Sequence, residues 1–275
     1  MYGHLDKQPE MDGWDKGMGP WKPILKNKKL YGRGGADDGY ALFASICSIK
    51  ALQEQQIRLP RILILIEFSE ESGSPDLPHY MNLCKNKIGT PDLVICLDSG
   101  TGDYKRLWTT TSLRGLIGLK LRVDVLKEGV HSGGASGYVP SSFRIARQLL
   151  SRIENQETGE ILLDELKVKI PDFRTKEAKK YVQVIGKDLR KEFPWVSNMQ
   201  PSTDNDVEGV LRRTWKPALS VVGGGGLPPS ENAGNVLRPY TELQLSIRIP
   251  PLINQKKAQS AIKKVLLENP PYNSK

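Results

Sequence analysis

Short apolar segments and amphipathic segments alternate along the first hundred residues. Residues 61–68 read RILILIEF and residues 92–97 read DLVICL, and both patterns are typical of buried strands. Residues 40–55 carry apolar side chains at helical spacing, which predicts a helix that begins near Asp37 and Asp38. Strands that alternate with helices in this way predict an α/β fold with a parallel sheet.

The pattern changes after Asp98, and residues 108–114 are typical of a crossing into a second domain. The glycine run at residues 223–226 is not followed by the GK[ST] of a phosphate loop and predicts a flexible loop on the substrate side. The order strand, helix, strand, strand, helix lacks only a final strand to form a split ferredoxin-like unit. We therefore expect domains at residues 1–112 and 113–275. The elements predicted for the second domain are strands at residues 116–126, 219–222 and 243–249, and helices at residues 141–153, 175–193 and 258–267, with Phe143 on the apolar face of the first helix.

Composition restricts the class of protein. A chain of 275 residues with 38% hydrophobic and 26% charged residues is globular and long enough for two domains. The net charge of +9 comes from scattered basic residues without interleaved aromatic side chains, so a solvated surface is favoured over a nucleic-acid face. The sequence therefore predicts no nucleic-acid partner.

Cysteine usage and hydropathy bear on the compartment. Cys47, Cys84 and Cys96 lie in apolar segments without CxxC spacing, which favours free thiols and a reducing cytoplasm. No apolar run approaches the roughly 18 residues of a membrane span, and no signal peptide is recognised. We expect a cytoplasmic protein that does not enter a membrane.

Polar clusters follow the predicted strands at regular spacing. The intervals between His4, Asp37, Glu71 and Asp98 are 33, 34 and 27 residues, close to the roughly 30 residues of a strand, helix, strand unit. Ligands of open α/β sheets collect beyond the carboxyl ends of the strands, so we expect these side chains to share one crevice. One imidazole beside several carboxylates predicts a hydrolytic metal site.

The two acidic pairs differ in how strongly they point to chemistry. Asp37 and Asp38 precede a helix, where acidic residues are often only partners of the helix dipole. Glu70 and Glu71 directly follow an apolar strand, and their mutual repulsion raises the proton affinity of one carboxylate unless a cation compensates. A metal ligand beside a general base would explain that arrangement.

Seven motifs in order resemble the M20 metallopeptidases, which include carnosine dipeptidases and succinyl-diaminopimelate desuccinylase. The similarity covers essentially the whole chain and is greatest to the dipeptidase branch. It implies a parallel-sheet catalytic domain, here partial, with an inserted ferredoxin-like α+β dimerisation or lid domain. The motifs are YGHLDKQPE at residues 2–10, DGW at 12–14, LYGRGGADD at 30–38, EESGS at 70–74, DLVICLD at 92–98, LRG at 113–115 and HSG at 131–133.

The resemblance implies a role for each of nine residues and two divalent ions, zinc first, with manganese or cobalt as alternatives. In the second domain, His131 would reach the active site of the partner subunit in a homodimer and stabilise the oxyanion. Asn235 and Arg248 would contact the carbonyl and carboxylate of a small peptide substrate, although Arg248 could equally be a structural ion-pair partner. In the first domain, His4, Asp37 and Asp98 would hold one ion, Asp37 and Glu71 the other, Asp6 would orient His4, and Glu70 would act as general base.

The departures from the family pattern are also informative. The family has segments before the His4 motif and after the second domain, including a last metal-binding histidine, whereas this sequence contains only His4, His79 and His131. Gly39 and Tyr40 stand where a lysine is expected after the Asp pair. We therefore expect a fragment that encodes hydrolysis of peptide or amide bonds near a free carboxylate, binds one ion tightly and turns over slowly. The alternative is a noncatalytic remnant or oligomerisation module.

Overall fold

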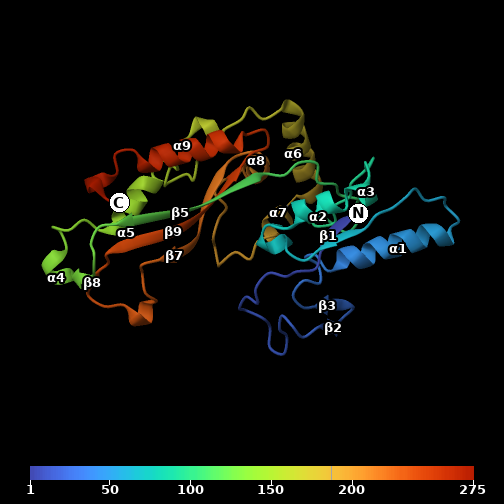
Figure 1. The fold of residues 1–275 in the computed structure, drawn as a ribbon, viewed down its shortest axis with the longest axis horizontal. Helices are drawn as coiled ribbons and strands as arrows, with labels where there is room; N and C mark the ends of the chain where they lie inside the picture. Colours follow the sequence, from blue (N-terminus) through green and yellow to red (C-terminus); the bar gives the residue numbers. More distant parts are fainter. Residues whose placement is uncertain (187) are drawn as a thin grey trace. The chain divides into compact units, whose positions relative to one another are not determined.

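The computed structural model describes residues 1–186 and 188–275 and divides into two compact units, residues 1–104 and 105–275 (Figure 1). The expected mixture of helix and sheet is present in both units. The identification of these units as a catalytic domain and an inserted dimerisation domain stays a prediction.

A short parallel sheet lies at the centre of unit 1. Strand β1 (Tyr2–His4) pairs in parallel with β4 (Leu65–Glu67), which places His4 opposite Glu67. The strands predicted at residues 61–68 and 92–97 are wrong in extent, because the first is reduced to β4 and the second to a single parallel bridge between Cys96 and Tyr2. The apolar side chains of residues 93–95 are exposed, Leu93 by 74%, and those of residues 62–66 are only half-buried, so no second layer within unit 1 covers these segments and extends their pairing.

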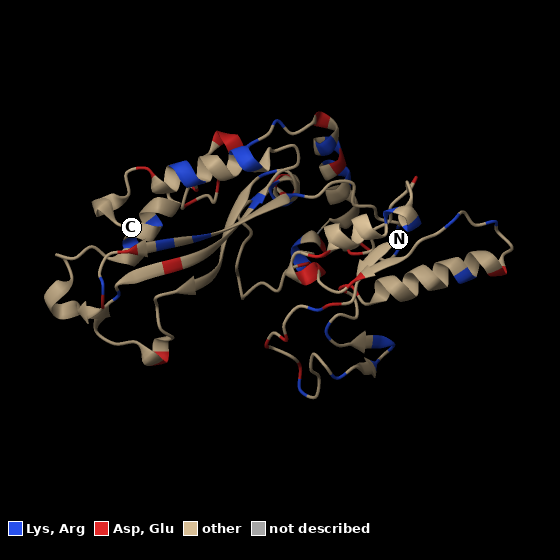
Figure 2. Cartoon of the chain, in the orientation of Figure 1, with Lys and Arg blue, Asp and Glu red and all other residues tan. Residues whose placement is uncertain are grey.

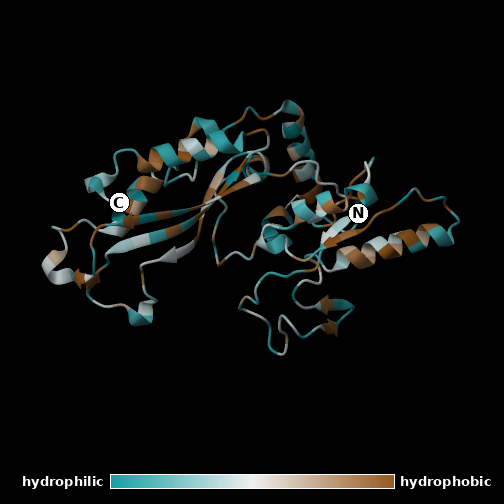
Figure 3. Ribbon diagram, viewed as in Figure 1, coloured by the Kyte–Doolittle hydropathy of each residue, from teal (hydrophilic) through white to brown (hydrophobic). Residues whose placement is uncertain are grey.

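Helix α1 (Tyr40–Glu54) confirms the helix predicted from the apolar periodicity. It packs closely on β1, because a side chain at Gly3 would meet Ala41 Cβ at 2.4 Å. Much of α1 is nevertheless coloured as hydrophobic in Figure 3, and Phe43 is 67% exposed. The buried contact of α1 is therefore a narrow strip of small residues rather than a broad apolar face.

A β-hairpin precedes α1 in unit 1. It consists of β2 (Ile24–Lys26) and β3 (Lys29–Tyr31), joined through Asn27 and Lys28 at φ values of 51° and 61°. Two consecutive residues in the left-handed region are typical of a type I′ hairpin turn. The remaining elements of unit 1 are the 3-10 helix η1 (Glu70–Ser72) and the helices α2 (Leu77–Leu83) and α3 (Lys85–Ile88).

An antiparallel sheet with the strand order β5, β9, β7 forms the framework of unit 2. Strands β5 (Gly115–Asp124) and β9 (Tyr240–Ile249) pair along their whole length, and β7 (Ala218–Gly225) lies on the other side of β9. This order is compatible with the expected ferredoxin-like unit.

Helices α5 (Ser142–Leu150) and α9 (Gln255–Leu267) cover one face of this sheet (Figure 1). Alternate residues of β9, such as Leu245 and Ile247, are fully buried beneath them. The expectation that Phe143 faces the core is wrong, because this side chain is 43% exposed. Ser142 is buried in its place and forms a 2.8 Å hydrogen bond with the hydroxyl of Thr241.

The glycine run is part of the sheet rather than a flexible loop. Gly223, Gly224 and Gly225 pair with β9 after a register irregularity that follows Val221. Strand pairing uses backbone groups, so the absence of side chains does not prevent it. Only Gly226, at φ 82°, leaves the strand.

A second, smaller core joins α6 (Asp172–Ile185), α7 (Asp188–Lys191) and α8 (Asp206–Thr214). The single helix predicted at residues 175–193 ends instead at Gly186, and its residue 187 lies outside the described residues. The other elements of unit 2 are β6 (Val130–His131), α4 (Ser132–Ala135), η2 (Asp164–Leu166), η3 (Ser230–Asn232), β8 (Val236–Leu237) and η4 (Pro271–Asn273).

Charge and hydropathy of the folded chain agree with the composition. Lys and Arg side chains are distributed over elements of both units in Figure 2. Within the described ranges, none of the helices has the length and apolar character that crossing a bilayer requires.

Replacing Ile247 by alanine should destabilise unit 2 by about 2–5 kcal/mol, because the change empties a fully buried site on the central strand. Urea unfolding monitored by hydrogen exchange of β5 and β9 amides would measure this loss. Gln244→Ala is the matched control, since Gln244 lies exposed on the same strand and should change stability by less than about 0.5 kcal/mol. Equal losses from both variants would contradict the assignment of this core.

Candidate metal and substrate site

The imidazole of His4 is the buried centre of the candidate site in unit 1. It lies at the end of β1 with 0% exposure, and its backbone N–H donates to Asp38 Oδ2 at 3.2 Å. Nδ1 lies 3.2 Å from the carbonyl oxygen of Asp6. Since a carbonyl only accepts, Nδ1 carries the hydrogen in the neutral ring, and the lone pair is left on Nε2.

Carboxylates surround Nε2 of His4. Asp37 Oδ1 lies 3.2 Å away, Asp98 Oδ2 3.8 Å and Glu70 Oε2 3.9 Å. Among the described residues, this buried nitrogen has no hydrogen-bond partner. Nε2 and the carboxylate oxygens around it are all acceptors, so none of them can donate a hydrogen bond to another. A cation bound among them would satisfy all of these atoms.

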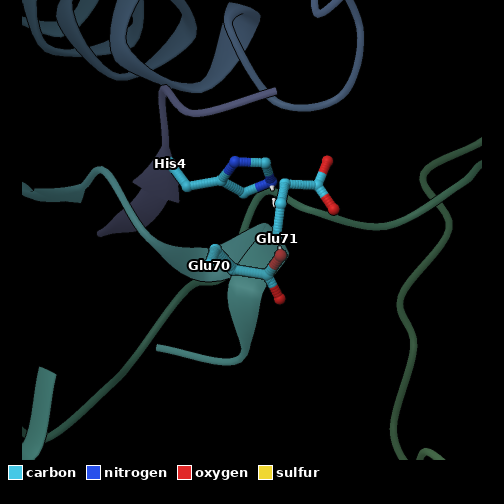
Figure 4. A group of neighbouring side chains, drawn as sticks. All are labelled: His4, Glu70 and Glu71. Carbon is cyan, nitrogen blue, oxygen red and sulfur yellow. Dashed lines mark ion pairs between the residues drawn. The ribbon is translucent and has the colours of Figure 1, made fainter. Parts of the chain in front are cut away.

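The potential ligand atoms form two overlapping groups that share His4. One group joins His4 to Asp37 and Asp98, the other joins His4 to Glu70 and Glu71, and the atoms of each group lie within 4.8 Å of one another. Figure 4 shows the second group, in which the ring from β1 points toward carboxylates carried by η1. The structure thus brings the four predicted ligands and Glu70, the predicted general base, into two groups around His4. Asp37 and Glu71, which were expected to hold the second ion together, belong to different groups.

Asp6 connects the imidazole to the turn that carries the glutamates. Its two carboxylate oxygens accept hydrogen bonds from the backbone N–H groups of Glu70, at 3.2 Å, and Glu71, at 2.8 Å. Oδ1 of the same carboxylate lies 3.3 Å from Nδ1 of His4. Gln8 adds a hydrogen bond from its amide to Glu71 Oε2. Asp6 therefore fixes the ring and both glutamates relative to one another.

The pKa values of the group respond to the concentration of negative charge. Burial raises the pKa of Glu70, and the charges of Asp98, Glu71 and Asp6 raise it further against the opposing effect of His4. Burial lowers the pKa of His4, but the bond to the Asp6 carbonyl and the charges of Asp98, Glu70 and Asp6 outweigh it, so that this pKa is raised. The site therefore favours added positive charge.

The nitrogen and oxygen donors of this site fit zinc, and its many carboxylates fit manganese as well.

Asp37 and Asp38 are joined by a cis peptide bond and differ in environment. Asp38 is buried against the His4 backbone, whereas the Asp37 side chain is 60% exposed and reaches the imidazole. The geometry thus makes Asp37, rather than Asp38, available to an ion.

Supporting residues that the sequence analysis missed lie beside this group. Glu67 is buried and accepts hydrogen bonds from the Tyr2 hydroxyl and from Ser74 Oγ, the latter at 2.9 Å. Burial raises the pKa of Tyr2, and the hydrogen bond and charge of Glu67 add to the shift. A glutamate inside the apolar run RILILIEF was the available signal. Tyr40, noted only as a departure from the family, donates to the Leu97 carbonyl beside Asp98.

His131 and Asn235 lie side by side in unit 2. Strand β6 pairs with β8, and the backbone N–H of Ser132 donates to the Asn235 carbonyl at 2.9 Å. Both predicted side chains belong to exposed residues. The N–H of Gly133 donates to Nδ1 of His131 at 3.2 Å, so the neutral ring carries its hydrogen on Nε2 and presents a donor to the outside.

Arg248 lies exposed on β9, between Leu116 of β5 and Ala218 of β7. In the part of the chain that the structure describes, it forms no ion pair, so a structural ion-pair role gains no support. The structure separates the nine predicted residues into six in unit 1 and three in unit 2.

Gly133→Ala should displace the His131 ring, because a Cβ at this position would lie 2.9 Å from Cε1 and 3.1 Å from Nδ1. Nitrogen chemical shifts of the His131 ring should report loss of the Nε2–H form as the dominant tautomer. Gly134→Ala is the matched control in the same short helix, since no atom of the described residues lies within 4 Å of its Cβ position. Identical ring shifts in both variants would contradict the contact.

The comparisons with known proteins agree with the order of these motifs. The model of "Peptidase family M20/M25/M40" matches residues 1–269. The Cysteinylglycine-S-conjugate dipeptidase of Corynebacterium striatum is 26% identical over 253 residues, covering 91% of this chain and 53% of that protein. The Beta-Ala-His dipeptidase of Rattus norvegicus is 27% identical, covering 91% of this chain and 51% of that protein. The chain thus spans about half the length of these curated relatives.

Solved structures give the same result for the fold. The di-peptidase Dug1p from Saccharomyces cerevisiae superposes with a TM-score of 0.73 at 26% identity, over 96% of this chain and 56% of that one. The M20 family metallo-carboxypeptidase Sso-CP2 from Sulfolobus solfataricus superposes with a TM-score of 0.77 at 21% identity, over 96% and 60% of the two chains. Because the family model extends over nearly the whole sequence, this chain belongs to peptidase family M20/M25/M40.

Proposed function

We propose that this chain carries the metal-binding centre and the lid of a metal-dependent hydrolase that cleaves peptide or amide bonds in dipeptide-like substrates with a free carboxylate. The observation that supports it most strongly is the buried, unpaired Nε2 of His4 facing the carboxylates of Asp37, Asp98 and Glu70 within the described part of unit 1. A metal-dependent peptidase needs a metal ion at a position where a histidine nitrogen and several carboxylates meet.

Two divalent ions, when bound, would polarise the scissile carbonyl and acidify a water molecule. His4, Asp37 and Asp98 would hold the first ion, and Asp37 with Glu71 the second. Glu70, whose pKa is raised by burial and by its acidic neighbours, is suited to accept a proton from the attacking water and return it to the leaving amine.

The residues of unit 2 would act on the substrate. His131 would donate its Nε2 hydrogen to the oxygen that becomes negative during attack, a contribution that preorganised donors make effectively. Arg248 would bind the terminal carboxylate through paired N–H donors, and Asn235 would contact a substrate carbonyl. The relatives' names suggest Cys-Gly and β-Ala-His as the first substrates to test.

Assembly and compartment belong to the same proposal. Val221 and Val222 are exposed by 50% and 63% on β7, the strand at one edge of the described sheet, and this edge suits pairing in a homodimer. Cys47, Cys84 and Cys96 are free thiols, in keeping with a reducing cytoplasm.

Zinc titration of the chelator-stripped chain, with a competing fluorescent chelator, tests the metal assignment. We expect one tightly bound ion, because the His4, Asp37 and Asp98 group offers three ligands to a single point. Affinity should fall as the pH drops through the raised pKa of His4, by up to about tenfold per pH unit, because ion and proton compete for Nε2. Manganese and cobalt would be compared in the same assay.

Hydrolysis of Cys-Gly and β-Ala-His should be slow and abolished by chelation. Two-ion occupancy with rapid turnover would contradict the expected impairment. Zinc affinity that stays constant as the pH falls would show that no imidazole binds the ion. A chain that dimerises but binds no divalent ion would instead support the noncatalytic oligomerisation module.

A further inference from the structure

A cavity of about 300 Å³ lies in unit 2, apart from the residues to which the proposed hydrolysis assigns a role. It is formed by α7, by α8, by the segment between them and by Arg114 at the start of the sheet. This volume is at the lower end of the range of small-molecule sites. The lining residues are Arg114, Leu189, Arg190, Phe193, Trp195, Pro201, Ser202, Thr203, Asp206, Gly209, Arg212, Arg213 and Ala218.

Most of the positive charge around the cavity is already neutralised. Three of the lining arginines have carboxylate partners. These pairs are Arg190 with Asp206 at 3.1 Å, Arg212 with Glu208 at 2.9 Å and Arg213 with Glu192 at 2.5 Å. The first and third pairs connect α8 to α7 and to the segment between these helices, whereas the second lies within α8.

Arg114 differs from these arginines. Its Nη1 donates to the backbone carbonyls of Arg212 and Lys216, both at 3.2 Å, and no carboxylate of the described residues pairs with it. Burial lowers the pKa of Arg114, and the charges of Arg248 and Arg213 lower it further. A half-buried guanidinium beside other cations is therefore short of negative charge.

The lining also includes aromatic and hydroxyl side chains. Phe193 and Trp195 contribute aromatic rings in T-shaped contact, with ring centroids 5.8 Å apart. Ser202 and Thr203 add hydroxyl groups, which are able to donate or accept hydrogen bonds. Inorganic anions would use the charge but not this apolar wall, whereas an organic acid would use both.

We propose that this cavity binds a small organic carboxylate, whose anionic group pairs with Arg114 and whose apolar part lies against Phe193 and Trp195. Arg114 is the centre of the LRG motif at residues 113–115, to which the proposed hydrolysis gives no role. The planar guanidinium offers paired N–H donors that match the two oxygens of a carboxylate. A bound carboxylate would neutralise the charge of Arg114 and so relieve its repulsion by Arg213.

Binding of benzoylglycine to the full chain tests this site, with isothermal titration calorimetry in excess chelator so that no metal ion holds the probe. Arg114→Gln should weaken binding at least about tenfold, because a charge-assisted pair is lost. The uncharged amide of benzoylglycine should bind weakly and equally to both proteins. Arg144→Gln is the matched control, since Arg144 is exposed on α5 and does not line the cavity.

Gly209→Leu provides a test that leaves Arg114 in place. The nearest atom of the described residues to the Cβ position of Gly209 is Thr203 Cγ2 at 3.8 Å, so a larger side chain would enter the cavity. Leucine is also a better helix former than glycine, so α8 should be retained. Benzoylglycine should bind this variant at least about tenfold more weakly, as filling the cavity removes the contacts of its ring.

Three results would overturn the proposal. They are no binding of benzoylglycine to the wild-type chain, equal binding by the wild-type chain and Arg114→Gln, and binding of inorganic phosphate as tight as that of benzoylglycine. The last result would assign the cavity to anions in general. Because chelator is present throughout, none of these results depends on the metal site proposed in unit 1.

Discussion

Replacing His4 by alanine is expected to weaken zinc binding by about a hundredfold. The roughly 10–16 kcal/mol of a four-ligand zinc site, shared evenly, amounts to about 3 kcal/mol per ligand. His4 is the neutral nitrogen donor common to both groups of potential ligands, and its removal leaves carboxylates that repel one another. Competition with a fluorescent chelator would measure the change in dissociation constant.

His79→Ala is the matched control for this variant. His79 lies exposed on α2, outside both groups of ligand atoms, so its loss should leave zinc affinity unchanged. Because His4 is fully buried, circular dichroism and amide hydrogen exchange should accompany the titration to show that β1 and β4 remain paired. A folded His4→Ala chain with wild-type zinc affinity would rule out His4 as a ligand.

Asp6→Asn should produce the second largest effect, a loss of about 10–100-fold in zinc affinity, as is typical when a group that supports a metal ligand is removed. The aspartate carboxylate accepts the N–H groups of both Glu70 and Glu71 while it contacts the His4 ring. An asparagine has only one accepting oxygen, so its amide group would face one of these N–H donors. The turn that carries the glutamates should then separate from the imidazole.

Hydrogen exchange of the Glu70 and Glu71 amides gives a readout that loss of charge alone would not move. Exchange at both positions should accelerate in Asp6→Asn, because their hydrogen-bond acceptor is impaired. Asp12→Asn, at an exposed residue of the same segment, removes an equal charge and should leave exchange and zinc affinity unchanged. If the Glu70 and Glu71 amides stay protected, Asp6 does not hold the turn.

Helices were more predictable from this sequence than strands. The apolar periodicity placed α1, α5 and α9 within a few residues, because a helix forms its hydrogen bonds within one continuous segment. RILILIEF and DLVICL carry an equally strong signal, but a strand needs a neighbour, and unit 1 provides only the short pairing of β1 with β4 and the bridge at Cys96. The glycines of β7 show the converse, since β9 recruits them despite their weak strand signal.

The candidate site was also predictable from the sequence in part and dependent on the tertiary structure for the rest. Spacing predicted that His4, Asp37, Glu71 and Asp98 would share one crevice, and their potential ligand atoms, together with that of Glu70, form two groups that share His4. The double acceptance by Asp6 and the support of Glu67 by Tyr2 and Ser74 join residues more than 60 positions apart or across a turn, and no local pattern encodes them. Arg114 has no carboxylate partner among the described residues, because the carboxylates near the cavity pair with arginines of α7 and α8 instead. This distribution of ion pairs also depends on the tertiary structure.

The sequence by itself determined the family, the positions of the main helices and the set of candidate metal ligands, because these depend on residue type and spacing along the chain. Tertiary structure decided which strands pair, which of Asp37 and Asp38 reaches the imidazole, and where a cavity remains beside an uncompensated guanidinium. These properties arise from contacts between distant segments. Burial then sets their energetic consequences, since a charge or hydrogen-bonding group matters most where water is excluded.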